Sequence, residues 1–384
     1  MSVSTNDPHA PGMPIVTVIG DGQLARMMQT EATELGLTIR LLAGATDSSA
    51  AQVTPDITVG DYTQLADVQA VASGASAVTF DHEHVPNDIL HTLIDSGINV
   101  QPVPDALIYA QDKLKMREKL QELGLPVPWF TIVTDPAALP SGKPICLKAI
   151  RGGYDGHGVW FTDDAPTLAA ELMDKGVDLM AEDKVELKRE LSILSARRPS
   201  GDIAQWAITE TIQTDGICVE ALAPAPGLTD EQEETIRHIG RTVAEKLGVT
   251  GVLAVELFET TDGEILINEL AMRPHNTGHW TQDGSVTSQF EQHLRAVLDL
   301  PLGSTALTAP ATCMVNTLGG DKEQDIPAAM RTVWETYPEA KIHWYGKSYR
   351  AGRKLGHVNV SGADATTVRA RARAAAAIIV GKHE

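Results

Sequence analysis

The chain has 384 residues, of which 43% are hydrophobic and 21% charged, and its formal net charge is −20. The length predicts two or three domains with their own cores, and the composition is that of a globular protein in water. The negative charge disfavours a nucleic-acid partner, and no apolar run reaches the ~18–20 residues of a membrane span. Residues 1–13 lack a secretory signal and are predicted to be a disordered lead. Three distant cysteines, Cys146, Cys218 and Cys313, fit free thiols in a cytoplasmic protein better than disulfides or a zinc site.

The first part of the chain alternates strand-like and helix-like segments. Residues 14–20 and 37–44 are apolar runs, and residues 21–36 between them have apolar positions at helical spacing. This βαβ order predicts a parallel sheet. The turn at 20–25 only just satisfies the dinucleotide-binding pattern, so two interpretations stay open: a helix start that faces an anion such as phosphate, or a structural tight turn.

A polar run from Asp81 to His84 follows the strand predicted for residues 76–80. Open α/β sheets bind ligands at the carboxyl ends of their strands. A metal site formed by this run is the weaker interpretation, because consecutive side chains on an extended segment point to opposite faces. Glu83 is the stronger candidate for a residue that faces a ligand.

One helix is predicted over residues 105–123, with a domain boundary near residue 112. Most of its cationic side chains are expected to face solvent. They are Lys113, Lys115, Arg117 and Lys119.

Lys148 lies inside an otherwise apolar strand, and the glycine-rich segment GGYDGHG follows it at residues 152–158. A buried lysine is costly unless an anion accompanies it, and the backbone N–H groups of such loops bind phosphates. No GK[ST] opens a helix here, so the segment is not a Walker A loop. A phosphate-binding loop is predicted, with a plain hairpin turn as the alternative. Further along, a strand that ends near Glu182 and a short linker toward Glu190 suit a slot for adenine and ribose.

The densest set of polar residues lies in LINELAMRPHNTGHWT, residues 266–281. The segment before it, 251–264, is predicted to form a strand and a turn, and it carries Glu256. Antiparallel strands joined by a short turn bring Glu256 and Glu269 together. One or two carboxylates together with nucleotide phosphates are the usual ligands of Mg²⁺.

A basic segment lies near the C-terminus, between residues 341 and 360. It is a candidate clamp for a phosphate group, and a solvated basic turn is the alternative. Its cationic residues are Lys347, Arg350, Arg353 and Lys354.

Taken in order, these segments resemble the ATP-grasp superfamily. Within it, several motifs are similar to the N5-carboxyaminoimidazole ribonucleotide synthetase family of purine biosynthesis, over residues 14–360. The motifs are GDGQLARMM (20–28), TFDHEHVP (79–86), GGYDGHG (152–158), KRELSI (188–193), NELAMRPHNTGHWT (268–281), SQFEQHLRAVLDLPLG (288–303) and KSYRAGRKLGH (347–357).

The resemblance implies an α/β fold of the ATP-grasp type. Its parts would be a Rossmann-like domain at 14–112, an ATP-grasp domain with a mobile lid at 113–305, and a small C-terminal domain at 306–384. The implied activity is that of an ATP-grasp ligase that carboxylates 5-aminoimidazole ribonucleotide with bicarbonate and ATP, through carboxyphosphate. The resemblance also implies a homodimer. Lys113 stands where the family usually has arginine.

The resemblance also assigns roles to individual residues. The residues implied for ATP are Lys113, Lys148, Gly153, Tyr154, Asp155, Gly156, His157, Gly158, Val159, Glu182, Asp183, Lys184, Val185, Glu190, Gln213, Asn268 and Glu269. Those implied for Mg²⁺ are Glu256 and Glu269. The catalytic residues would be Asp155, Arg273, His275 and Asn276. The substrate-binding residues would be Gln23, Leu24, Glu83, Tyr154, Arg273, Lys347, Arg353 and Lys354.

Two other kinds of protein stay open. One has different ATP-grasp chemistry, either a formate-dependent ribonucleotide transformylase or a biotin carboxylase-like subunit, and the basic segment and RPHNTGH count against it. The other is a nucleotide-binding sensor without turnover, which would not need two carboxylates for Mg²⁺.

Overall fold

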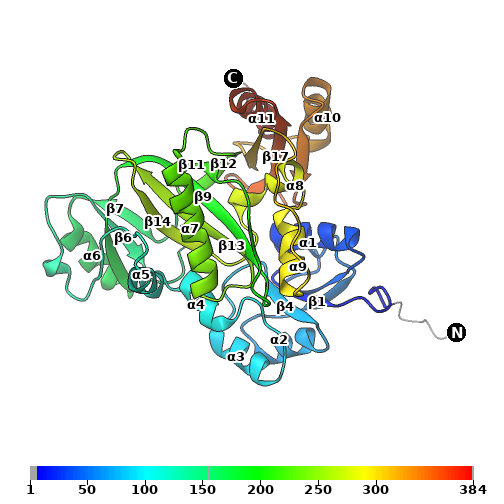
Figure 1. The fold of residues 1–384 in the computed structure, drawn as a ribbon, viewed down its shortest axis with the longest axis horizontal. Coiled ribbons are helices and arrows are strands. Elements are labelled where there is room, and N and C mark those ends of the chain that lie inside the picture. Colours follow the sequence, from blue (N-terminus) through cyan, green and yellow to red (C-terminus); the bar gives the residue numbers. More distant parts are fainter. Residues whose placement is uncertain (1–6, 154–155, 383–384) are drawn as a thin grey trace.

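The computed structural model describes residues 7–153 and 156–382, and these residues form three β-sheets with helices packed against them (Figure 1). Among the described helices, none combines the length and the apolar character that crossing a membrane requires. The mixed α/β class predicted from the sequence is confirmed.

The N-terminal region forms a four-stranded parallel sheet. Its elements are β1 (Val16–Ile19), α1 (Gln23–Glu34), β2 (Ile39–Ala43), β3 (Asp56–Val59), α2 (Leu65–Ala72), β4 (Ala77–Phe80) and α3 (Asn87–Asp95). The strand order is β3-β2-β1-β4, and all neighbours are parallel. β1 and β4 are buried throughout, as expected for a sheet covered on both faces. The predicted βαβ start is therefore confirmed.

The segment before β1 contacts this sheet. His9 Nε2 lies 2.7 Å from Asp56 Oδ2, and Thr38 Oγ1 donates a hydrogen bond to the Pro8 carbonyl at 2.9 Å. Residues 7–13 were predicted to belong to a disordered lead, and these contacts show that they are held against the fold instead. Residues 1–6 lie outside the described residues.

Two helices replace the single helix predicted over 105–123. They are α4 (Pro104–Gln111) and α5 (Lys113–Glu122). Asp112 separates them, because its carboxylate accepts a hydrogen bond from Lys115 N at 3.0 Å and caps the start of α5. Lys113 N also donates to the Ile150 carbonyl at 2.9 Å. The start of α5 is thereby fixed to the strand that carries Lys148.

The second sheet is antiparallel, in the order β5-β8-β6-β7. Its strands are β5 (Phe130–Ile132), β6 (Ile145–Ala149), β7 (Val159–Thr162) and β8 (Leu179–Asp183), with the short helix η1 (Pro136–Ala138) and α6 (Ala165–Met173). β6 is buried along its whole length, so Lys148 lies in an apolar strand as predicted.

The third sheet is the largest and is antiparallel throughout. Its strands are β9 (Leu187–Arg197), β10 (Ile203–Gln205), β11 (Thr209–Thr214), β12 (Ile217–Ala223), β13 (Gly251–Thr260), β14 (Ile265–Ala271), β15 (Ala311–Leu318), β16 (Lys341–Trp344) and β17 (Lys354–Gly362). The order is β14-β13-β9-β11-β12-β15-β17-β16, and β10 pairs with β9. Because β12 pairs with β15, the C-terminal strands extend the same sheet that holds β13 and β14.

The helices of this part are α7 (Asp230–Lys246), η2 (Asn276–Gly278), α8 (Thr281–Gly284), α9 (Gln289–Val297), α10 (Ile326–Thr336) and α11 (Ala365–Val380). α7 lies across β9 and β13 (Figure 1). A capping box begins it, in which Thr229 Oγ1 accepts from Gln232 N at 3.2 Å and Gln232 Oε1 accepts from Thr229 N at 3.1 Å. Its buried face carries Ile236, Ile239 and Val243.

Candidate functional site

A cleft of about 1120 Å³ is lined by strands of the second and third sheets, by the start of α1 and by the segment that follows β4 of the N-terminal sheet. It brings together most of the predicted site residues, although they are spread from residue 23 to residue 354. They are Gln23, Leu24, Glu83, Lys113, Lys148, Gly153, Gly156, His157, Val159, Glu182, Asp183, Lys184, Val185, Glu190, Gln213, Glu256, Asn268, Glu269, Arg273, His275, Asn276 and Lys354. Of the other predicted residues that the structure describes, Gly158, Lys347 and Arg353 do not line this cleft, and Tyr154 and Asp155 lie outside the described residues.

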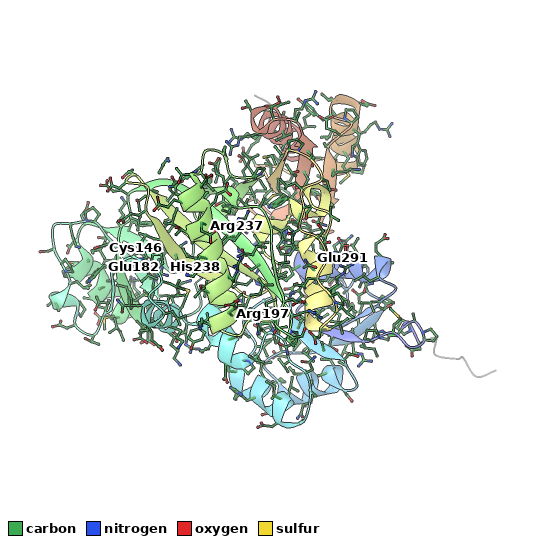
Figure 2. All side chains as sticks on the ribbon, in the orientation of Figure 1. Cys146, Glu182, Arg197, Arg237, His238 and Glu291 are labelled. Atoms are coloured by element: carbon green, nitrogen blue, oxygen red, sulfur yellow. The ribbon has the colours of Figure 1, made fainter. Side chains whose placement is uncertain are left out.

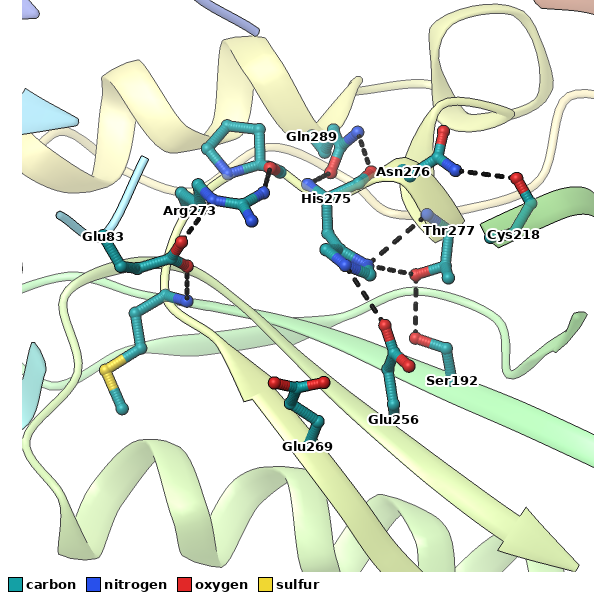
Figure 3. A network of polar contacts seen from close by, with 12 residues as sticks. Glu83, Ser192, Cys218, Glu256, Glu269, Arg273, His275, Asn276, Thr277 and Gln289 are labelled. Carbon is teal, nitrogen blue, oxygen red and sulfur yellow. Dashed lines mark hydrogen bonds and ion pairs between the residues drawn. The ribbon is translucent and has the colours of Figure 1, made fainter. Parts of the chain in front are cut away.

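Glu256 on β13 and Glu269 on β14 are direct partners in the antiparallel register, as the sequence predicted (Figure 3). A β-bulge follows directly after Glu256. Burial, and then the charges of Glu269 and Glu190, raise the pKa of Glu256 to about 8. A cation between the two carboxylates would relieve this repulsion, so the pair fits a hard divalent ion. No group of three or more potential metal ligands occurs among the described residues, so such an ion would also need oxygen atoms from a ligand.

Lys148 is the buried cation of β6, and its partner is a protein carboxylate. Its Nζ lies 2.7 Å from Glu182 Oε2 and donates to Asn268 Oδ1 at 3.1 Å. The other oxygen of Glu182 accepts from Arg117 Nε at 2.5 Å. Burial alone would raise the pKa of Glu182, but the charges of Lys148 and Arg117 hold it below the ordinary value. Glu182 is therefore an ionised carboxylate between two cations.

Lys113 at the start of α5 forms an ion pair with Glu269 Oε1. Although burial pushes it upward, the charge of Lys113 and its hydrogen bond hold the pKa of Glu269 below the ordinary value. The two carboxylates of the β13–β14 pair thus have pKa values shifted in opposite directions, since the pKa of Glu256 is raised and that of Glu269 is lowered.

The glycine-rich segment joins β6 to β7, whose register pairs Lys148 with Val159. The segment therefore connects two antiparallel neighbours, as the hairpin alternative required, and its residues Gly152, Gly153, Gly156 and His157 also line the cleft, where a phosphate-binding loop would lie. Gly156 has φ +79°, and a Cβ there would lie 2.7 Å from the Asp215 carbonyl oxygen. A side chain at residue 156 would push the segment away from the β11–β12 turn.

The linker after β8 lines one end of the cleft. Lys184 Nζ lies 5.8 Å from the centre of the Phe161 ring, and Lys143 Nζ lies 2.6 Å from Asp183 Oδ1. Beyond the linker, burial raises the pKa of Glu190, while a hydrogen bond from Gln213 opposes the shift. Exposed apolar surface beside a buried acid is suited to a base and its ribose.

The segment after β14 turns its polar side chains toward both carboxylates and the N-terminal sheet (Figure 3). Arg273 Nε donates to Glu83 Oε2 at 2.7 Å, and His275 Nε2 lies 3.2 Å from Glu256 Oε1. Burial, followed by the charges of Arg273 and Lys354, lowers the pKa of His275 well below its ordinary value. His275 is therefore neutral at physiological pH and acts through hydrogen bonds.

Residues that the sequence did not single out hold this segment in place. His275 N donates to Gln289 Oε1 at 2.8 Å, and His275 Nδ1 lies 3.0 Å from Thr277 Oγ1, which in turn lies 2.9 Å from Ser192 Oγ. Asn276 Nδ2 donates to the Cys218 carbonyl at 3.2 Å (Figure 3). Gln289, Ser192 and Cys218 come from α9, β9 and β12, so no local pattern identifies them.

The basic segment is only partly turned into the cleft. Lys347 is paired with Gln23 at the start of α1, as the predicted substrate-binding set requires, and Lys354 lines the cleft. Arg353 Nη1 instead donates to Ser348, at 2.9 Å to Oγ and 3.1 Å to the carbonyl. Burial, followed by the charges of Arg353 and Lys354, lowers the pKa of Lys347 to about 8 even though Asp81 opposes the shift. An anion bound here would offset the repulsion between Lys347 and the two neighbouring cations.

The start of α1 combines features of both open interpretations. Gly20 has φ +107°, and a Cβ there would lie 2.7 Å from the His82 ring, so the turn needs glycine. The N–H of Ala25 points to Asp81 Oδ2 at 3.4 Å. The group beside this helix start is thus the carboxyl of Asp81, whose pKa is raised by burial, and it is Gln23 and Leu24 that reach the cleft.

Most of the four cations of this helix were predicted to face solvent, but only Lys115 is exposed, and the Arg117 side chain is fully buried. A signal was present in the sequence, because Lys113, Met116, Arg117 and Leu120 share one helical face at i, i+3, i+4 and i+7. Lys115 and Glu118 on the same helix are exposed. The three cysteines are buried free thiols, as predicted.

Comparison with protein families gives three matches along the chain. The ribonucleotide synthetase preATP-grasp domain matches residues 13–111, the ATP-grasp domain matches 118–290, and the phosphoribosylaminoimidazole carboxylase C-terminal domain matches 312–371.

Among individual proteins, the N5-carboxyaminoimidazole ribonucleotide synthase of Corynebacterium ammoniagenes is 55% identical over 386 residues, which cover 97% of this chain and 93% of that one. The crystal structure of an ADP complex of N5-carboxyaminoimidazole ribonucleotide synthetase superposes with a TM-score of 0.87 at 31% identity, over 97% and 98% of the two chains. The Aspergillus clavatus N5-carboxyaminoimidazole synthase in complex with ADP and 5-aminoimidazole ribonucleotide gives a TM-score of 0.86 at 28% identity, over 95% and 98%.

Proposed function

The chain belongs to the N5-carboxyaminoimidazole ribonucleotide synthase family, and we propose that it carboxylates 5-aminoimidazole ribonucleotide with bicarbonate at the expense of ATP. The products would be N5-carboxyaminoimidazole ribonucleotide, ADP and phosphate, in purine biosynthesis. One observation carries the proposal most directly: the Glu256–Glu269 pair lies in the same cleft as Lys148 and Lys113 on one side and Arg273 and His275 on the other.

The nucleotide would occupy the side of the cleft formed by the second sheet. Lys148 and Lys113 would bind its phosphates as point charges, and the hairpin of residues 153–159 would cover them. The linker of residues 182–185 would hold adenine, while Glu190 and Gln213 would take the ribose. A superposable relative was solved as an ADP complex, which supports nucleotide binding by this fold.

Magnesium would be held by Glu256 and Glu269, with Asn268 beside them. The fit rests on the register pair and on the repulsion that raises the pKa of Glu256. Bound there with the ATP phosphates, the ion would supply charge neutralisation during phosphoryl transfer. In this structure Lys113 pairs with Glu269. When ATP and the metal bind, Lys113 would leave Glu269 and contact the phosphates, and Glu269 would contact the metal.

The acceptor side would be formed by Arg273, His275 and Asn276. A bicarbonate oxygen would attack the γ-phosphorus of ATP, ADP would leave, and carboxyphosphate would form. Its breakdown delivers CO₂ to the amine of 5-aminoimidazole ribonucleotide, and the phosphate released takes the amine proton. Arg273 and neutral His275 would orient these anions by hydrogen bonds, so catalysis would consist mainly of positioning and charge stabilisation.

The ribonucleotide phosphate would bind where the basic segment meets the start of α1. Lys347 and Lys354 would contact it with Gln23 and Leu24, and Arg353 would contribute from the rim. The pKa of Lys347 is lowered by burial and then by the charges of Arg353 and Lys354, and this cluster of partly buried cations supports an anion here. Glu83 would act through its ion pair with Arg273.

The proposed domain boundaries and subunit assembly are those that the family resemblance implies. We propose a Rossmann-like domain at 14–112, an ATP-grasp domain at 113–305 and a C-terminal domain at 306–384, which assemble as a homodimer. Light scattering at micromolar concentration would test the dimer, and a monomer mass would contradict it.

The test is ADP release by the purified protein with Mg²⁺ and ATP. Release should require 5-aminoimidazole ribonucleotide and increase with bicarbonate. No stimulation by that nucleotide would overturn the proposal. Stimulation by formate with glycinamide ribonucleotide would assign the protein to a transformylase activity instead.

A further inference from the structure

The two lysines proposed to bind phosphates are held by carboxylates of very different accessibility. Lys113 pairs with Glu269, whose side chain is 41% exposed, and Lys148 pairs with Glu182, whose side chain is 3% exposed. When phosphates take both ammonium groups, Glu269 can turn to the proposed metal ion. Glu182 lies on β8, in another sheet, and its side chain is almost fully buried, so it has little contact with water to replace the lysine. A buried carboxylate without a counter-charge is strongly destabilising.

Arg117 supplies a second, permanent counter-charge to Glu182. Its side chain is fully buried, and its Nε donates to Glu182 Oε1 at 2.5 Å. Lys148 lies at the other oxygen, Oε2, at 2.7 Å, so the two cations do not compete for one atom. Among the described residues, Arg117 Nη1 and Nη2 have no hydrogen-bond partner, which leaves Glu182 as the anion that fixes this guanidinium.

Cys146, the partner of Glu182 in the sheet, offers no substitute for this carboxylate. Figure 2 labels Cys146 and Glu182 side by side on the second sheet, and the register makes them direct partners on β6 and β8. Burial raises the pKa of the Cys146 thiol to about 11, although the charge of Lys148 opposes the shift. The thiol therefore stays neutral, and Glu182 is the anion shared by Arg117 and Lys148.

We propose that Arg117 is a positioning residue for ATP, which neutralises Glu182 so that Lys148 can leave this carboxylate and bind the nucleotide phosphates. This inference rests on the proposed function, because it takes Lys148 as a phosphate-binding residue. Without Arg117, Lys148 would be the sole counter-charge of a buried carboxylate and would have to break that ion pair to reach a phosphate. Nucleotide affinity would fall, and affinity for the ribonucleotide would not.

The test is a double-mutant cycle of Arg117→Met and Glu182→Gln, with Arg117→Lys as the conservative variant. Lys115→Met on the exposed face of the same helix is the matched control. Calorimetric titration with Mg²⁺ and ADP gives nucleotide affinity without turnover. Steady-state kinetics with ATP or 5-aminoimidazole ribonucleotide varied gives each KM, and thermal melting reports folding.

Arg117→Met should weaken ADP binding and raise the KM for ATP by about tenfold or more, as expected when one partner of a buried charge pair is removed. The KM for the ribonucleotide should stay within about twofold, since no contact to that side is lost. Arg117→Lys should retain most of the affinity, and Lys115→Met all of it. The double variant should bind ADP about as well as Glu182→Gln alone, because the buried anion that trapped Lys148 is gone.

Three outcomes would overturn the inference: unchanged ADP affinity in Arg117→Met, equal increases in the two KM values, or losses that simply add in the double variant. If Arg117→Met fails to fold, the double variant and Arg117→Lys still decide, because the inference requires both to fold and to bind ADP. Failure of the proposed function is seen separately, as wild-type protein that binds ADP but does not respond to the ribonucleotide.

Discussion

Replacing Glu83 with glutamine would remove the charge that holds Arg273 while keeping the shape of the side chain. Glu83 Oε2 accepts from Arg273 Nε at 2.7 Å, and Oε1 accepts from Met272 N at 3.2 Å. Both side chains of the ion pair are largely buried, at 12% and 23% exposure. A hydrogen bond between such charged groups contributes about 1.5–3 kcal/mol, and their remaining contact with water favours the lower part of that range, about 1.5–2 kcal/mol. If Arg273 orients the acceptor or bicarbonate, kcat/KM for 5-aminoimidazole ribonucleotide should fall about 10- to 30-fold.

The assay for Glu83→Gln is coupled ADP release with the ribonucleotide varied at saturating ATP and bicarbonate, followed by the reverse titration. The KM for ATP should stay close to that of the wild type, because Glu83 lies on the acceptor side of the cleft. Asp95→Asn, an exposed carboxylate at the end of α3, is the control and should behave as wild type. Unchanged kcat/KM for the ribonucleotide, or an equal loss for ATP, would refute the role given to Glu83 and Arg273.

Three further predictions follow from other parts of the structure. Glu269→Gln should lower kcat at least about 100-fold at unchanged circular dichroism, because it removes a proposed metal ligand; near-normal turnover would exclude Glu269 from the metal site. Lys347 is charged below its pKa of about 8 and neutral above it, so kcat/KM for the ribonucleotide should fall as the pH rises through that value. Lys347→Arg should abolish this decline, and the same decline in that variant would assign it to another group. Thr229→Ala, which removes the capping box of α7, should lower the free energy of unfolding by about 1 kcal/mol in urea denaturation without changing kcat; an unchanged midpoint would show that the box does not stabilise the helix.

Features that depend on neighbouring residues were predictable from the sequence. The turn at Asp262-Gly263 joins two apolar runs, so it brings Glu256 close to Glu269, and the β-bulge after Glu256, which the sequence did not reveal, makes the two residues direct partners. The βαβ order of the first 44 residues likewise implies a parallel sheet. The position of Lys148 in an apolar strand also predicted a buried cation that needs an anion as its partner.

Features that depend on distant residues were not predictable in this way. The pairing of β12 with β15 joins residues about ninety positions apart, and nothing in either strand specifies the other. Glu182 suited an adenine slot by its place at a strand end, yet its side chain turns inward to Lys148 and Arg117. Asp112 fits both the inside of a helical pattern and an N-cap, so the division between α4 and α5 became visible only in the structure.

The LINELAMRPHNTGHWT segment supplies both halves of the proposed site, since Glu269 faces the nucleotide side and Arg273 and His275 face the acceptor side. Lys113 on α5 contacts Glu269, and Glu83, which follows β4, contacts Arg273. A nucleotide-binding sensor would need only the first half. The proposed transfer of a carboxyl group from bicarbonate to the ribonucleotide needs both.

The most direct test of this account is the fate of oxygen from ¹⁸O-labelled bicarbonate during turnover with ATP, Mg²⁺ and 5-aminoimidazole ribonucleotide. If bicarbonate attacks the γ-phosphorus and the resulting carboxyphosphate breaks down in the cleft, the inorganic phosphate must carry one bicarbonate oxygen. Mass spectrometry of the phosphate should therefore show a single ¹⁸O in each molecule, in proportion to the ADP formed. Unlabelled phosphate, released at the same rate as ADP, would contradict the account.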